Sequence, residues 1–182
     1  MRFTSTELPG VVIVEPQVFG DDRGFVMETW HANKFADGGI AVTFLQDNHS
    51  HSARGVLRGM HFQPVHSQGK LVRVARGEIF DAAVDLRRDS PHFGKWTGRI
   101  LSEDDKRQIW IPQGFAHGFY VLSEFADVIY KCTDIYAPEH ERTLRWDDPD
   151  VAIQWPLQNG PPVLSPKDTE GLTLRELQQI LL

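Results

Sequence analysis

Hydrophobic residues along this chain occur in short runs that are separated by turn residues. The runs are rich in Val, Ile, Phe and Trp, and they include Val11–Val14, Leu71–Ala75, Ile79–Leu86, Ile109–Ile111, Phe119–Leu122 and Val128–Tyr130. Turn residues lie between them at 20–24, 38–39, 76–78, 89–91, 112–114 and 147–150. Many short strands with frequent turns predict an all-β sandwich or barrel.

Two segments are predicted to be helical. The first is a short candidate at Trp30–Phe35, and the second is the C-terminal tail, where Leu174, Leu177 and Leu181 recur at helical spacing. Neither changes the fold class, so we expect short helices at the periphery of a β-sheet core. A small closed sheet can leave an interior that holds one ligand. The candidate functional residues are therefore polar side chains on inward-facing strand positions.

The length and composition fit one globular domain. The chain has 182 residues, 41% hydrophobic and 24% charged, which is enough for one domain spanning 1–182 with a hydrophobic core. The formal net charge of −6 gives no basic surface of the kind that binds nucleic acid. An anionic ligand remains compatible with this charge, because a local cluster of Arg and Lys can bind phosphate.

Three features predict a cytoplasmic protein. Cys132 is the single cysteine, which excludes an internal disulfide and fits a reducing compartment. The first ten residues have no basic segment followed by an apolar run, so they do not resemble a secretory signal. No stretch approaches the roughly 20 apolar residues of a membrane helix. We expect neither a membrane nor a nucleic-acid partner.

Candidate chemistry is concentrated in the segments 56–63 and 68–73. Strand alternation places His61 and Gln63 on one face of the first strand, and Lys70 with Val72 on one face of the second. Arg58 is an odd number of residues from His61, so strict alternation would place it on the opposite face. A bulge or kink at Gly59 would bring both side chains to the same side.

A second motif, Pro112-Gln113-Gly114-Phe115-Ala116-His117, resembles the second motif of the cupin superfamily. The resemblance implies a double-stranded β-helix, the jelly roll. In metal-binding cupins the first motif is His-x-His followed by a Glu. Here Gln63 replaces the second histidine, and Lys70 lies where the carboxylate is expected. A lysine ammonium has no lone pair for a metal, so we expect no metal site.

The combined motifs resemble a narrower family, the dTDP-4-dehydrorhamnose 3,5-epimerases, from about Pro16 to Asp168. The residues that carry this resemblance occur in family order at 19–25, 46–50, 56–59, 61–63, 68–73, 114–119, 130–131 and 164–168. One such motif alone would be weak, whereas the ordered set is specific. The resemblance implies a cofactor-independent enzyme that inverts C3 and C5 of a dTDP-linked 4-keto-6-deoxy sugar.

The resemblance also assigns residue roles. His61 matches the general base, Asp168 the carboxylate that pairs with it, Lys70 the cation facing the enolate, and Tyr130 the general acid. The residues that match ligand contacts are Phe19, Arg23, Glu28, Gln46, Asp47, Asn48, Arg58, His117, Glu141 and Lys167. Arg23 and Arg58 resemble diphosphate ligands, and Phe19 resembles a contact for the base. Some N-terminal contacts of the family come from a partner subunit, which implies a homodimer with shared sites.

Ordinary interpretations compete with several of these roles. Tyr130 could simply pack beside Val128, Asp168 could serve a turn or helix cap, and Arg23 could face solvent. The pair His49 and His51 resembles metal ligands, but its polar surroundings favour loop histidines. Three other functions also remain open: a C3-only epimerase, a metal-dependent cupin using His61, His117 and His49, and a non-catalytic sugar-nucleotide binder.

Overall fold

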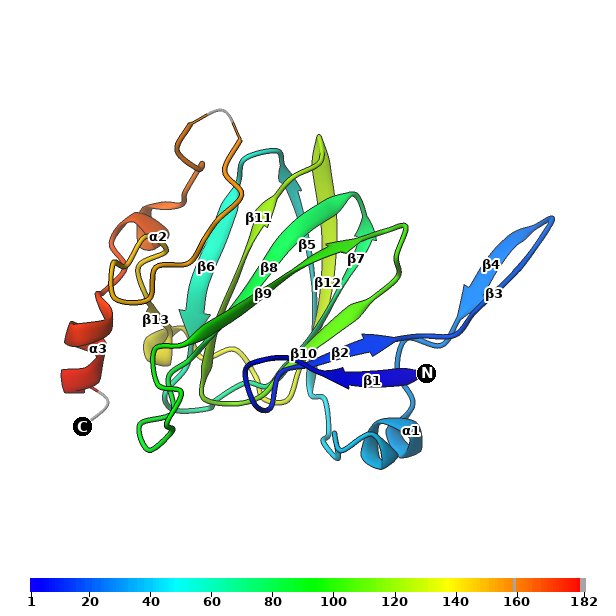
Figure 1. Ribbon diagram of the computed structural model, residues 1–182, viewed down its shortest axis with the longest axis horizontal. Helices are drawn as coiled ribbons and strands as arrows, with labels where there is room; N and C mark the ends of the chain where they lie inside the picture. The colour runs from blue at the N-terminus through cyan, green and yellow to red at the C-terminus, as the bar shows by residue number, and fades with distance from the viewer. Residues whose placement is uncertain (159, 181–182) are drawn as a thin grey trace.

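Two antiparallel sheets face each other in the computed structural model, which describes residues 1–158 and 160–180 (Figure 1). The six-stranded sheet has the spatial order β1 (Arg2–Ser5), β2 (Val12–Glu15), β10 (Gln108–Ile111), β7 (Lys70–Arg76), β12 (Phe125–Cys132) and β5 (Gln46–Ala53). The five-stranded sheet has the order β13 (Arg142–Thr143), β6 (Leu57–Phe62), β11 (Phe115–Val121), β8 (Glu78–Asp85) and β9 (Trp96–Ser102). The predicted fold class, a cupin-type jelly roll with short helices, is confirmed.

Side chains that point between the sheets form the central core. Val72 and Val74 of β7 pack there with Ile79 and Ala83 of β8. Lys70 shares the inward face with these valines, as strand alternation predicted. Each strand can therefore contribute apolar side chains to the core at one end and polar side chains to a cavity at the other.

Short helices and loops cover the outer faces of the sheets. Helix α1 (Ala32–Asp37) buries Phe35 beside Leu71 and Trp110 on the six-stranded sheet. Helix α3 (Leu174–Ile180) buries Leu177 beside Met60 on the five-stranded sheet. The structure also contains η1 (Pro138–His140) and α2 (Pro166–Thr169). No helix in residues 1–158 and 160–180 has both the length and the apolar character needed to cross a membrane.

Both predicted helices are present, with shifted bounds. The predicted helix Trp30–Phe35 begins two residues later, at Ala32, because the backbone of the N-cap residue His31 is extended, with φ of −149° and ψ of 118°. The tail helix includes Leu174 and Leu177. Leu181, the third apolar position of the predicted tail helix, lies outside the described residues.

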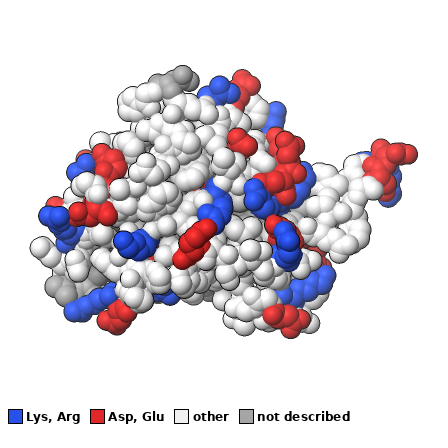
Figure 2. Space-filling view, viewed as in Figure 1, with Lys and Arg blue, Asp and Glu red and all other residues white. Residues whose placement is uncertain are grey.

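A β-hairpin extends away from the two sheets. It consists of β3 (Val18–Asp21) and β4 (Gly24–Met27), joined by the predicted turn at Asp22 and Arg23 (Figure 1). Three apolar side chains along it, Phe19, Phe25 and Val26, are more than half exposed. Its tip carries charges of both signs, which include the ion pair of Arg23 with Asp21 (Figure 2). Both strands of the hairpin expose apolar residues, and such an exposed apolar surface is typical of a protein–protein contact.

The prediction that His49 and His51 lie in a loop is wrong, because both belong to strand β5. Their side chains point outward, and both contact Asp127 of β12, at 2.9 and 3.1 Å. The alternate residues of β5, Gln46 and Asn48, face the space between the sheets. Both faces of this strand are polar, so the usual hydrophobic alternation of a strand is missing from its sequence.

The kink expected at Gly59 is present as a bulge. His117 of β11 pairs with His61 of β6, and Phe119 pairs with Arg58, so two residues of β6 lie opposite Gly118 alone. Gly59 has φ of 137°, and a Cβ there would lie 2.5 Å from the Cα of Gly118. Only glycine fits this position. The extra residue returns Arg58 to the face that carries His61.

Candidate active site

A cavity of about 600 Å³ opens between the two sheets. It contains all four predicted catalytic residues, His61, Lys70, Tyr130 and Asp168. Of the predicted binding residues it contains Gln46, Asn48, Arg58, His117, Glu141 and Lys167. These side chains come from both sheets, from α2 and from the end of η1, so the packing of these elements is what brings them together.

His61 and Asp168 form the shortest polar contact of the cavity. Nε2 of His61 lies 2.5 Å from Oδ1 of Asp168. The other carboxylate oxygen accepts a hydrogen bond from Oγ of Ser165 at 2.8 Å. Because Nε2 bonds to the carboxylate, a neutral imidazole has its proton on Nε2 and its lone pair on Nδ1. The pair therefore presents Nδ1 as the basic nitrogen.

The local sequence of α2 fixes the position of Asp168. Ser165 is the N-cap residue of this short helix, and Pro166 occupies its first position, where a missing N–H costs nothing. Asp168 is only 2% exposed. The interpretation of Asp168 as a helix-capping residue is therefore partly right, since it interacts with the cap, but its carboxylate also reaches the imidazole.

Burial and pairing shift the pKa values of this dyad. Burial lowers the pKa of His61 and outweighs the opposing effect of the Asp168 carboxylate. For Asp168 burial acts to raise the pKa, but the hydrogen bonds from His61 and Ser165, together with the charge of His61, lower it overall. The dyad therefore favours a neutral imidazole beside an ionised carboxylate.

Lys70 supplies a partly buried cation on the opposite sheet. It is the first residue of β7, and it pairs in register with Ile111 and Cys132. Burial lowers the pKa of its ammonium, because desolvation disfavours the charged form. Within the described part of the chain, no side chain forms an ion pair with this ammonium. Its charge is thus available to an anionic group in the cavity.

Tyr130 lies on the same sheet as Lys70. On β12 it pairs with Asn48 of β5 and Val72 of β7, so its ring points inward and packs against the central core. Burial raises the pKa of its phenol, which keeps the hydroxyl protonated near neutral pH. His61 belongs to the other sheet. A ligand between the sheets would have the imidazole on one side and the phenol on the other.

A second histidine–carboxylate pair lies beside the first. His117 is the cross-strand neighbour of His61, and its Nε2 lies 2.8 Å from Oδ2 of Asp81. Asp81 is fully buried, and its other oxygen is one of four buried side-chain atoms without a hydrogen-bond partner among the described residues. This buried contact fixes the His117 ring in the cavity wall.

Charged side chains that line the cavity make two separate sets of polar contacts. Lys167 donates a hydrogen bond to Oε2 of Glu141 at 2.7 Å, and the hydroxyl of Tyr136 donates to the same oxygen at 3.1 Å. Arg58 donates from Nε to Oγ of Ser52 at 2.8 Å. Lys70, Arg58 and Lys167 each bring a cationic group to the cavity wall, and such groups suit phosphate oxygens.

Four predicted binding residues lie outside this cavity. Phe19, 57% exposed, and Arg23, which pairs with Asp21, belong to the hairpin. Glu28 follows the hairpin and pairs with Lys34 at 2.8 Å. Asp47 faces outward from β5 and pairs with Lys131 at 2.8 Å. The chain alone does not bring these side chains to the cavity.

The structure adds residues that the sequence reasoning left unassigned. The additional cavity-lining residues are Ser50, Gln68, Phe119, Tyr136, Ser165 and Pro166. Most of them lie inside the matched motifs, and this position in the sequence could have identified them as cavity residues. Tyr136 lies outside these motifs, and so does Asp81, which supports His117. Among residues 1–158 and 160–180, no three His, Cys, Asp or Glu side chains are grouped to share a metal ion.

Comparisons with known proteins agree on one family. A family model described as dTDP-4-dehydrorhamnose 3,5-epimerase matches residues 5–176. A Pseudomonas aeruginosa protein of that name is 58% identical over 94% of each chain. The crystal structure of a Legionella pneumophila epimerase in complex with dTDP-4-keto-L-rhamnose has a TM-score of 0.96 at 50% identity, covering 100% of this chain and 96% of that one. ChmJ, a 3'-monoepimerase from Streptomyces bikiniensis, is more distant, with 29% identity, a TM-score of 0.89 and coverage of 96% and 89%.

Proposed function

Because this chain belongs to the dTDP-4-dehydrorhamnose 3,5-epimerase family, we propose that the cavity between its sheets is the site of that reaction. The protein is an epimerase that converts dTDP-4-dehydro-6-deoxy-D-glucose to dTDP-4-dehydro-L-rhamnose by inversion at C3 and C5. Both carbons flank the C4 ketone, so a proton lost from either gives an enolate with its charge on the C4 oxygen. One site can therefore treat each carbon in turn.

His61 is the proposed base. Its Nδ1 lone pair removes the proton from C3 or C5, and the contact of Nε2 with Asp168 stabilises the imidazolium that forms. The lowered pKa of His61 keeps the imidazole neutral, and therefore competent as a base, at neutral pH. Lys70 is the proposed partner of the enolate oxygen, because an ammonium in a desolvated cavity stabilises an oxyanion strongly.

The placement of His61 and Tyr130 on opposite sheets carries this proposal. Inversion requires that the proton leaves from one face of the sugar and returns to the other. A base on β6 and an acid on β12 can approach a sugar ring between the sheets from opposite sides. Tyr130 is the proposed acid, and its raised pKa keeps the phenolic proton available.

The remaining contacts concern the nucleotide diphosphate. We assign Arg58 and Arg23 to its phosphates, and Gln46, Asn48, His117, Glu141 and Lys167 to polar groups of the ligand. Phe19, Arg23 and Glu28 lie outside the cavity of their own chain, so we propose that they complete the cavity of a second copy. The exposed apolar hairpin supports a homodimer of this kind. We further propose that residues 1–182 act as one domain in the cytoplasm.

Incubation with the keto sugar in deuterated water tests the proposed reaction. The enzyme is expected to introduce deuterium at C3 and C5, which NMR detects at each carbon separately. Label at C3 alone would indicate a monoepimerase, and no label would indicate a binding protein. His61→Asn is expected to abolish the exchange, whereas His49→Asn on the outer face of β5 leaves it unchanged. Substantial exchange in folded His61→Asn protein would exclude His61 as the base.

A further inference from the structure

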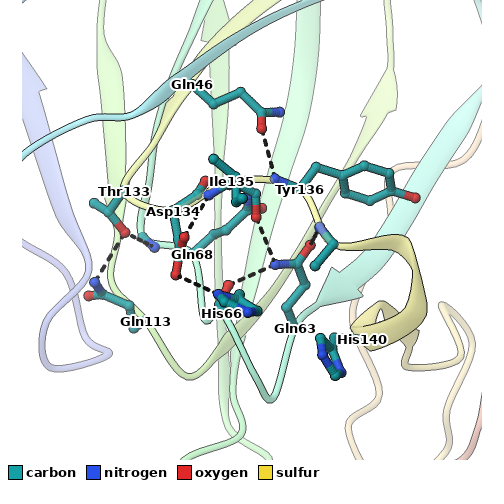
Figure 3. Close-up of polar contacts among 12 residues, drawn as sticks. Gln46, Gln63, His66, Gln68, Gln113, Thr133, Asp134, Ile135, Tyr136 and His140 are labelled. Atoms are coloured by element: carbon teal, nitrogen blue, oxygen red, sulfur yellow. Dashed lines mark hydrogen bonds and ion pairs between the residues drawn. The ribbon is translucent and has the colours of Figure 1, made fainter.

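Glutamine side chains hold the loop that follows β12, residues 133–137 (Figure 3). Gln46 accepts a hydrogen bond from the backbone N–H of Tyr136 at 2.8 Å. Gln68 donates to the carbonyl of Asp134 at 2.8 Å. Gln63 makes two contacts with this loop, described next. Side chains, rather than a neighbouring strand, satisfy much of the polar backbone of this loop.

Gln63 is the most buried of these glutamines near the cavity, with 4% exposure. Its amide nitrogen donates to the carbonyl of His66 at 2.7 Å and to the carbonyl of Ile135 at 3.3 Å. Its amide oxygen accepts from the N–H of Ala137 at 3.0 Å. Both amide donors and the acceptor are therefore used, and they connect the loop after β6 with the loop after β12.

The loop held by Gln63 carries Tyr136 to the mouth of the cavity. The Tyr136 side chain is 48% exposed and lines the cavity. In Figure 3 its ring extends away from the glutamine contacts. Its hydroxyl bonds to Glu141 at 3.1 Å, and its backbone N–H bonds to Gln46. Tyr136 is thus held at its hydroxyl and at its backbone N–H. Gln63 bonds the residues on either side of it, Ile135 and Ala137.

We propose that Gln63 is a positioning residue for ligand binding: its buried amide holds residues 135 and 137 so that Tyr136 presents its ring at the cavity mouth. The inference rests on the proposed function, because it assigns the ring to contact with the nucleotide part of a dTDP-sugar. The base His61 is held separately, by Asp168 and by strand pairing with His117 and Thr143. Gln63 should therefore govern affinity rather than proton transfer.

The first measurement is the affinity of the full-length protein for dTDP by calorimetry. Gln63→Met keeps the length and apolar volume of the side chain but removes all three hydrogen bonds. We expect the Kd for dTDP and the KM for the keto sugar to rise roughly tenfold, with kcat changed less than about twofold. Gln113→Ala is the matched control, because Gln113 also bonds this loop, at Thr133, but is exposed and outside the cavity. Its Kd should stay close to that of the unaltered protein.

A double-mutant cycle with Tyr136→Ala separates positioning from a purely structural role. If Gln63 acts through Tyr136, Gln63→Met should weaken dTDP binding little in the Tyr136→Ala background. An equal loss with and without the tyrosine would overturn the proposal. So would a folded Gln63→Met protein that binds dTDP normally, or a Gln113→Ala protein that loses as much affinity.

A second variant keeps the proposal testable if Gln63→Met does not fold. Gln63→Glu retains the side-chain length and the acceptor for the Ala137 N–H, but it cannot make both donations. The same cycle is then run with this variant and judged by the same outcomes. Failure of the epimerase function is recognised separately, because unaltered protein would then exchange no deuterium even while it binds dTDP.

Discussion

Asp168→Asn is the substitution that most directly tests how the His61–Asp168 pair works. The side chain keeps its shape. Its amide oxygen can still accept from Nε2 of His61, and its NH₂ group can donate to Oγ of Ser165, which the carboxylate contacts at 2.8 Å. The change therefore removes the negative charge while it preserves the tautomer that leaves Nδ1 basic.

The expected loss of rate follows from the hydrogen bond between His61 and residue 168, whose acceptor becomes neutral in the variant. A bond to a charged group contributes about 1.5–3 kcal/mol, and it strengthens when the imidazolium forms in the transition state. Loss of that contribution slows proton removal by roughly 10- to 100-fold. The carboxylate also acts to raise the pKa of His61, so the acidic limb of kcat/KM should move to lower pH in the variant.

The assay is the initial rate of deuterium incorporation at C3 and C5. Asp127→Asn is a matched control, since Asp127 also contacts histidines but lies on the outer face of the six-stranded sheet. It should exchange at the normal rate. A folded Asp168→Asn protein that exchanges as fast as the unaltered enzyme would refute the role of the carboxylate in supporting the base.

Three further results are expected. Tyr130→Phe should impair inversion more than deuterium exchange, because the phenol acts after the enolate forms; equal loss of both in NMR assays would make Tyr130 a residue that only orients the substrate. The pH profile of kcat/KM should be bell-shaped. On the acidic side, activity falls as the imidazole of His61 gains a proton, and burial lowers this pKa below the ordinary 6.5. On the basic side, activity falls as the ammonium of Lys70 loses a proton, and burial lowers this pKa below the ordinary 10.5. An acidic limb above 6.5 would contradict the first assignment. Dialysis against a chelator should leave activity unchanged, with metal removal checked by elemental analysis. A loss of activity that a stoichiometric metal restores would favour the metal-dependent cupin.

Local sequence determined the parts of the fold that depend on neighbouring residues. Apolar runs such as 71–75 and 79–86 predicted strands because side chains alternate between the faces of a sheet. The same rule placed Lys70 on the inward face with Val72. The glycine at position 59 predicted a bulge, since only glycine tolerates a close approach of two backbones. The motifs, taken together, predicted the family.

Strand β5 shows where this reasoning fails. Its inward face lines a polar cavity and its outward face carries charged groups, so the pattern of a buried strand is absent. Hydrophobic periodicity reports burial in an apolar core. The inward face of β5 carries polar side chains instead of apolar ones, so its sequence resembles that of a loop.

Only the tertiary structure decided which polar residues meet. His61 and Asp168 are 107 positions apart and come together because α2 packs beside β6. Tyr130 and Lys70 share a sheet, opposite His61, through strand pairing between distant segments. Asp47 is adjacent to two cavity residues yet faces away from them, and the hairpin takes Phe19 and Arg23 out of their own cavity. Such long-range contacts depend on the whole packed arrangement, so residue identity and spacing alone cannot specify them.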